Sequence, residues 1–286
     1  MRRVLPIGVP ELAPDGDAFL WRTQHEVELW STDGKQRARA EGGWGYLRTL
    51  DRQFSPSGNR AALLVTRRTD GERSWPHSWL AVVDVSSGKT VTSTDLGPLS
   101  EATMDWYDDR LFIAGALARR SASDEAQPAL LVSVSPEGDV RKAELTEPGP
   151  AEHVRMSASH GDGVVYVAVG TEGREPRGPV WACSAETFTP VHEIDVGAFH
   201  VLDLKAGPVA LAIYGHAVGE GPHELKLFRG NRVRSLLTWP WSARRMLESP
   251  RSDVLLMAGL APRDDWRELY AVGWHELIKR FELRVP

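Results

Sequence analysis

The chain has only one cysteine among its 286 residues, so no disulfide bond can form within it. Sparse cysteine is typical of proteins that work in a reducing compartment, and it predicts a cytoplasmic protein. It also excludes a structural zinc site built from several thiolates. The single residue, Cys183, follows the apolar residues 180–182, which predicts a buried and unreactive side chain.

The chain also lacks a long apolar run and an excess of basic residues. Residues 1–10 are basic and then apolar, but Pro6 and Pro10 interrupt them. The apolar part is shorter than the core of a signal peptide and far shorter than a membrane span, so no membrane association is expected. The formal net charge is −5, whereas a nucleic-acid-binding domain usually carries a basic face. A nucleic-acid partner is therefore not expected either.

Sequence patterns that mark common catalytic sites are missing as well. The chain has no phosphate-binding glycine loop, no dinucleotide fingerprint and no G-x-S-x-G nucleophile elbow. We therefore predict no cofactor, and a protein that is not an enzyme is favoured over an enzyme with an unfamiliar site.

What the chain does have is an internal repeat. Each unit consists of an apolar run, a tight turn, a second apolar run, a loop, a third run, another tight turn and an alternating run. The turns that follow the third run are 45 to 54 residues apart. They begin near Thr32, Ser86, Pro136, Ser184, Arg229 and Trp274.

Repeated units of four short strands indicate a β-propeller, in which each blade is a four-stranded sheet. A lone sheet of this size leaves apolar faces in water, and stacking between two neighbours buries both. We predict an all-β fold: a single β-propeller domain over 1–286 with six four-stranded blades. Five or seven blades, or a pair of β-sandwiches, are the alternatives, and 274–280 is the one weak helical candidate. The predicted blades are approximately 4–41, 46–95, 101–146, 151–196, 198–239 and 242–283.

Three turns and their flanking strands resemble the repeats of TolB-type and WD40-type propellers. They are Phe54-Ser55-Pro56-Ser57-Gly58, Val83-Asp84-Val85-Ser86-Ser87-Gly88-Lys89 and Leu29-Trp30-Ser31-Thr32-Asp33-Gly34-Lys35. The Trp-Asp pair of WD40 blades is missing, and neither the Gly-His pair of WD40 blades nor the double glycine of kelch repeats recurs from unit to unit. The resemblance implies a bacterial propeller that holds other macromolecules, as one subunit of a multi-component assembly, although fold alone does not decide function.

The loops between the second and third strands of the units are long, and the other turns are mostly tight. Long loops on a rigid scaffold are where binding residues tend to lie, so we predict that the partner-binding face is the one that carries these loops. The loops are expected at 67–78, 116–128, 171–178, 215–223 and 260–267.

The predicted binding residues belong to types that are enriched at interface hot spots or that flank such residues in the same loops. An equally valid interpretation is that these charges are solvated loop decoration. The residues are Arg67, Arg68, Arg73, Trp75, His77, Arg119, Arg120, Arg174, Arg177, Arg263, Trp266 and Arg267.

Two weaker constellations suit a metal ion. Carboxylates on the inner strands, Asp51, Asp105, Asp203 and Glu248, could bind a divalent cation near the axis. Histidines near one end of units four and five could bind a metal or act as acid and base, and these are His153, His200, His216 and His223. The simpler alternative in both cases is hydrogen bonding between blades or at a rim.

Three hypotheses for function follow from these patterns. The leading one is a non-catalytic interaction scaffold that binds one or more partner proteins through the long-loop face. The second is a small-molecule hydrolase, lactonase or lyase with its site in the central funnel. The third is a propeller that binds a carbohydrate or another small ligand on exposed tryptophans.

Overall fold

The structure is a computed structural model of the chain. It describes residues 11–22, 26–41, 51–67, 77–107, 109–118, 127–151, 153–159, 163–170, 179–207, 209–217, 222–239, 243–248, 254–260 and 267–283.

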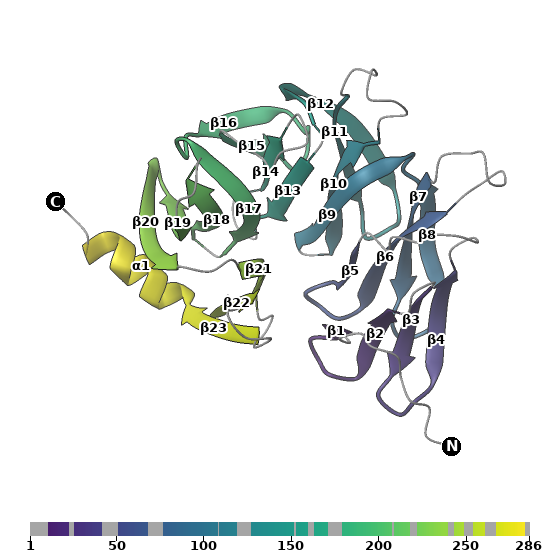
Figure 1. Ribbon diagram of the computed structural model, residues 1–286. Coiled ribbons are helices and arrows are strands. Elements are labelled where there is room, and N and C mark those ends of the chain that lie inside the picture. The colour runs from purple at the N-terminus through teal and green to yellow at the C-terminus, as the bar shows by residue number, and fades with distance from the viewer. Residues whose placement is uncertain are drawn as a thin grey trace. The chain divides into compact units, whose positions relative to one another are not determined.

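Within these residues the strands form six antiparallel sheets, five with four strands and one with three. In every sheet the strands are hydrogen-bonded to each other in the order in which they follow along the chain (Figure 1). The predicted all-β class is confirmed. The prediction of six four-stranded blades is correct for five sheets and wrong for the last.

The chain divides into two compact units. The first consists of residues 1–125 and 130–143 and contains sheet 1, sheet 2 and most of sheet 3. Sheet 1 contains β1 (Glu11–Leu12), β2 (Ala18–Arg22), β3 (Glu26–Ser31) and β4 (Gln36–Glu41). Sheet 2 contains β5 (Asp51–Phe54), β6 (Arg60–Arg67), β7 (His77–Asp84) and β8 (Thr90–Asp95). Sheet 3 contains β9 (Leu99–Tyr107), β10 (Arg110–Leu117), β11 (Pro128–Val134) and β12 (Val140–Pro150).

The second unit consists of residues 126–129 and 144–286 and contains the remaining sheets. Sheet 4 contains β13 (His153–Ala158), β14 (Val164–Gly170), β15 (Val180–Ser184) and β16 (Pro190–Ile194). Sheet 5 contains β17 (Phe199–Ala206), β18 (Leu211–Ala217), β19 (His223–Arg229) and β20 (Arg232–Trp239). Sheet 6 contains β21 (Ala243–Glu248), β22 (Val254–Leu260) and β23 (Arg267–Gly273), and helix α1 (Trp274–Leu283) follows it.

The helix replaces the fourth strand that we predicted for sheet 6. No turn-forming glycine, asparagine or proline follows Gly273 for the next ten residues, so the chain has no local signal to fold back as a hairpin. Trp274, Leu277 and Phe281 instead recur at helical spacing, and all three are buried. They pack with Leu225 and other apolar residues of sheet 5. The correct signal in the sequence was the weak helical pattern over 274–280.

Each described sheet has two ends with different connections. We call the end that carries the loop between the second and third strands the loop end, and the opposite end the turn end. Because neighbouring strands are antiparallel, the connection to the next sheet also leaves from the loop end. The tight turns between first and second and between third and fourth strands lie at the turn end.

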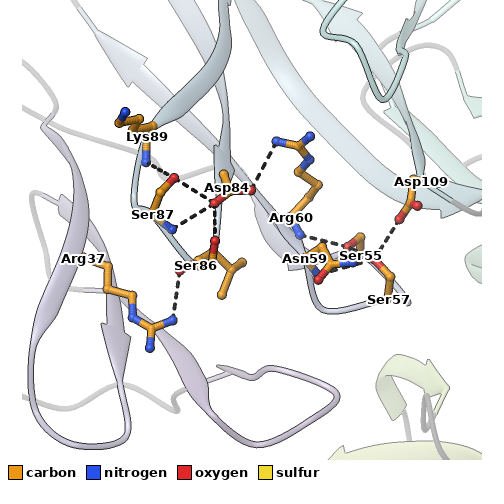
Figure 2. Close-up of polar contacts among 11 residues, drawn as sticks. Arg37, Ser55, Ser57, Asn59, Arg60, Asp84, Ser86, Ser87, Lys89 and Asp109 are labelled. Atoms are coloured by element: carbon orange, nitrogen blue, oxygen red, sulfur yellow. Dashed lines mark hydrogen bonds and ion pairs between the residues drawn. The ribbon is translucent and has the colours of Figure 1, made fainter.

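Polar side chains interlock the turn ends of the first unit (Figure 2). The guanidinium of Arg37, on β4, donates through Nη1 to the carbonyl oxygen of Val85 in sheet 2 at 2.9 Å. Ser57, in the β5–β6 turn, donates from Oγ to Oδ1 of Asp109 in sheet 3 at 2.8 Å. These contacts tie the turns of sheets 1, 2 and 3 to one another.

Asp84 organises the β7–β8 turn. Its Oδ1 accepts hydrogen bonds from Ser86 Oγ at 2.7 Å and from Ser87 N at 2.9 Å and Oγ at 2.8 Å. Its Oδ2 lies 3.7 Å from Nη1 of Arg60. The hydrogen bond from Ser86, the two from Ser87 and the nearby Arg60 charge lower the pKa of Asp84 to about 2. An aspartate at the start of a turn can in this way accept hydrogen bonds from the backbone and hydroxyl groups of the turn, in place of water.

Gly88 is required in the same turn for two reasons. Its φ is 69°, a conformation that side-chain-bearing residues rarely adopt. In addition, a Cβ at this position would overlap the carbonyl oxygen of Arg37 in sheet 1. Gly34, in the corresponding turn of sheet 1, has a φ of 87° but no atom within 4 Å of where its Cβ would lie.

These two glycines provide a matched pair of substitutions. We expect Gly34→Ala to lower the free energy of unfolding by about 1–2 kcal/mol, the cost of a left-handed residue alone. Gly88→Ala should cost at least twice as much, because the new methyl group also pushes two sheets apart. Urea denaturation of both variants measures the difference, and equal losses would show that the close approach of the sheets does not stabilise the fold.

The low pKa of Asp84 gives stability that depends on pH. The folded value lies below the usual 3.8, so the ionised carboxylate stabilises the fold above about pH 4, and this contribution is lost as the pH falls toward 2. The difference in unfolding free energy between the wild type and Asp84→Asn should therefore be constant from pH 7 to about pH 5 and shrink below pH 4. A difference that stays unchanged down to pH 2 would contradict the role of the charge.

Candidate functional site

The predicted binding loops lie at the loop ends of the sheets, and most of their residues lie outside the described part of the chain. Of the described residues, Arg67 ends β6, His77 begins β7 and Arg267 begins β23. The loop predicted at 215–223 is shorter than expected, because β18 continues to Ala217. The following predicted residues lie outside the described ranges: Arg68, Arg73, Trp75, Arg119, Arg120, Arg174, Arg177, Arg263 and Trp266.

His77 and Asp95 form a fixed polar pair at the loop end of sheet 2. His77 Nδ1 lies 2.7 Å from Asp95 Oδ2, and the two side chains are 35% and 36% exposed. Asp95 is held in turn, because its Oδ1 accepts the N–H of Gly97 at 2.8 Å. The Nζ of Lys142, on β12, donates to the carbonyl oxygen of Asp95. A histidine whose Nδ1 contacts a carboxylate presents Nε2 outward in a defined orientation.

The connection that contains Asp95 recurs between sheets 4 and 5. Asp195 Oδ1 accepts the N–H of Gly197 at 2.7 Å, as Asp95 does from Gly97. The two glycines have φ values of 73° and 82°. The apolar residues between and after them, Leu96 with Leu99 and Val196 with Phe199, are buried. We call this five-residue pattern a joint, because it turns the chain from one sheet into the next. Its order is Asp, apolar, Gly, any residue, apolar.

Each joint fits against a glycine on the second strand of the sheet that it enters. A Cβ on Gly115 would lie 2.9 Å from Leu99 Cδ1, and a Cβ on Gly215 would lie 2.7 Å from Phe199 Cε1. At the second joint, Lys226 Nζ donates to Val196 O at 2.9 Å and lies 4.0 Å from the centre of the Phe199 ring. Burial lowers the pKa of Lys226. This joint was not predicted, although its five-residue pattern occurs twice in the sequence.

The inner-strand carboxylates occupy different positions along their strands. Asp51 begins β5, Asp105 and Asp203 lie within β9 and β17, and Glu248 ends β21. Asp105 is 4% exposed and accepts a hydrogen bond from Gln53 Nε2 at 3.2 Å. Asp105 and Asp203 each also accept the N–H of the residue that follows them. Hydrogen bonding within and between sheets accounts for these contacts, and a cation site near the axis stays a prediction.

Three of the four predicted histidines come together in sheet 5. His200 on β17, His216 on β18 and His223 on β19 lie directly opposite one another in adjacent strands. The ring centres of His200 and His216 are 4.8 Å apart, and those of His216 and His223 are 5.2 Å apart. We call these three residues the imidazole row. His153 begins β13 in sheet 4 and is not among the described ring contacts of the row.

In the part of the chain that the structure describes, no group of three or more histidine, cysteine, aspartate or glutamate side chains could hold a metal ion. Cys183 is buried, and burial raises the pKa of its thiol to about 11, as expected for an unreactive cysteine. Among the described residues, no helix is long and apolar enough to cross a membrane.

Solved structures with a similar fold identify the architecture. The β-propeller domain of the Trilobed protease from Pyrococcus furiosus matches 92% of this chain and 78% of its own, with a TM-score of 0.62 and 11% identity. The β-propeller domain of Cps50 (Swd1) from Myceliophteria thermophila matches 92% of this chain and 82% of its own, at a TM-score of 0.59 and 13% identity. The fold is of the β-propeller type.

A third similar structure, Pyrococcus horikoshii acylaminoacyl peptidase, is much longer than this propeller. It matches 95% of this chain at a TM-score of 0.62 and 12% identity, but this chain spans only 45% of the peptidase. Sequence identities this low show a similar fold and nothing about function. No family model matches the sequence, and no curated protein matches it.

Proposed function

We propose that this protein is a non-catalytic interaction module that binds one or more partner proteins through the loop ends of its sheets. The observation that supports this most directly is the contrast between the two ends. At the turn end of the first unit, Arg37 and Ser57 are engaged in contacts between turns, and Asp84 is engaged within its own turn. At the loop end of sheet 2, His77 is oriented by Asp95 while about a third of its side chain stays exposed.

A side chain that is fixed and still exposed is suited to binding, because little conformational entropy is lost when a partner docks on it. The loop that precedes it carries arginine and tryptophan, which are among the residues that contribute most to interface energies. Propeller domains occur both in proteases and in Cps50 (Swd1), so the fold is compatible with a binding role without requiring it. Membership of a bacterial multi-component assembly and a cytoplasmic location are part of this proposal.

An enzymatic role for a small-molecule hydrolase, lactonase or lyase is the second candidate. It is favoured by the imidazole row, because histidines close together can transfer protons. A carbohydrate-binding role has no such support among the described residues.

The finer form of the fold is also a proposal. We propose that residues 1–286 form one domain in which six sheets close into a single propeller. A compact domain of this length has a radius of gyration of about 19 Å, which small-angle X-ray scattering measures. A value well above this, with a scattering profile that indicates two separated bodies, would contradict closure.

Charge reversal in the loop of sheet 2 tests the docking face. We expect the double variant Arg68→Glu and Arg73→Glu to lose a stoichiometric partner that the tagged wild-type protein retains on purification from its native cells. Arg232→Glu is the matched control, since Arg232 is exposed and lies at the turn end of sheet 5. Quantitative mass spectrometry of the eluates provides the comparison.

Three outcomes can be distinguished. Loss of a partner in the loop variant alone supports the site. Equal retention in both variants places the contact elsewhere on the protein. If the wild-type protein purifies with no partner, the docking proposal is wrong and the enzymatic candidate takes its place.

A further inference from the structure

The polar pair at the loop end of sheet 2 indicates the chemistry of the ligand that can contact it. His77 Nδ1 lies 2.7 Å from Asp95 Oδ2, and 35% of the histidine side chain is exposed. Because the ring is held through Nδ1, Nε2 is the nitrogen that can meet a group from outside the chain. The charges around the pair decide which kind of group suits that nitrogen.

The carboxylate of the pair is engaged within the chain. Asp95 Oδ2 contacts the imidazole of His77, and Asp95 Oδ1 accepts the N–H of Gly97 at 2.8 Å. Both oxygens therefore already face donors of the same sheet and of the joint that follows it. The negative charge of Asp95 serves to fix the ring.

Two cationic residues lie beside the pair. Lys142, on β12 of sheet 3, is exposed, and its Nζ donates to the main-chain carbonyl oxygen of Asp95. An ammonium group that donates one bond to a carbonyl keeps two further N–H donors. Arg67 is the last residue of β6 and lies directly opposite His77 in the register of β6 and β7. Positive charge therefore reaches this position from sheet 2 and from sheet 3.

The sequence that joins β6 to β7 adds to this charge. Residues 67–77 contain three arginines against one aspartate and one glutamate, a net charge of +1 before any contribution from His77. The whole chain has a formal net charge of −5. A positive segment on a negative chain favours an acidic ligand and disfavours a basic one.

We propose that the loop end of sheet 2 binds an acidic segment of the partner protein, whose carboxylates contact His77 Nε2 and Lys142 Nζ. This assignment rests on the proposed docking function. A protonated imidazole donates to the incoming carboxylate through Nε2, while Asp95 accepts from Nδ1 on the other side of the ring. An acidic protein segment is favoured over a nucleic acid, because a nucleic-acid-binding domain usually carries a basic face and the chain is negative overall.

Cross-linking of the complex tests the contact directly. A carbodiimide joins a lysine amine as an amide to a carboxylate that it touches, and it adds no spacer. The tagged protein is treated with its partner bound, as purified from its native cells. We expect mass spectrometry to find Lys142 joined to an aspartate or glutamate of the partner. Lys35 and Lys89, which are exposed in turns at the turn end, should give no such product.

Substitutions measure how much each group contributes to binding. We expect His77→Gln and Lys142→Gln each to weaken the affinity for the purified partner about tenfold, because a hydrogen bond between charged groups is lost. The matched controls Lys89→Gln and His192→Gln change exposed residues outside the loop end of sheet 2 and should bind as the wild type does. If His77→Gln does not fold, the cross-link at Lys142 in the wild type decides the matter.

The outcomes separate the acidic contact from docking itself. If a partner protein is retained but gives no cross-link at Lys142, and if both loop-end variants bind it with unchanged affinity, the acidic contact is wrong and docking stands. A wild-type protein that purifies without a partner contradicts both. A retained partner that proves to be a nucleic acid would also overturn the acidic contact.

Discussion

The structure depends on a single constraint: the inner strands are apolar on both faces, and each face must be covered by another sheet. Sheet 2 shows this at adjacent residues. Leu63 packs with residues of sheet 1, whereas Leu64 packs with residues of sheet 3. Sheet 5 repeats the pattern, with Ile213 facing sheet 4 and Tyr214 facing the cluster that includes α1. Because successive side chains point to opposite faces, a continuous apolar run makes both faces of a strand apolar. Both faces must then be covered by neighbouring layers.

This constraint also explains how much of the fold could be predicted from the sequence. Runs such as 111–116 are buried along their whole length, and the short turns between runs carry Gly, Ser and Asp, so strand grouping was readable without a structure. Helix α1 was harder to predict, because a fourth strand and a helix after β23 would both need an apolar face. The spacing of Trp274, Leu277 and Phe281 selects a helix. This spacing has an effect only when sheet 5 is present, because the three side chains are buried against that sheet.

The candidate site was predictable in part. His200, His216 and His223 could be assigned to one end of their unit from strand order, but their direct opposition depends on register, and β17 contains a bulge between Val201 and Asp203 that shifts it. The pairing of His77 with Asp95 was not predicted, since the two residues belong to different strands and neither forms a recognisable motif. The loop residues that carried most of the predicted binding lie outside the described ranges.

Gly215 affects both the packing of the second unit and the positions of the imidazoles in the row. The missing side chain gives room to Phe199, and a Cβ there would also overlap the carbonyl oxygen of His200. Any larger residue would spread β17 from β18 and move the imidazoles of His200 and His216 apart. Replacing a histidine of the row would therefore leave the packing at the joint intact, whereas replacing Gly215 would disturb both the joint and the row. The spacing of the row is thus set by the close packing of the two strands at Gly215.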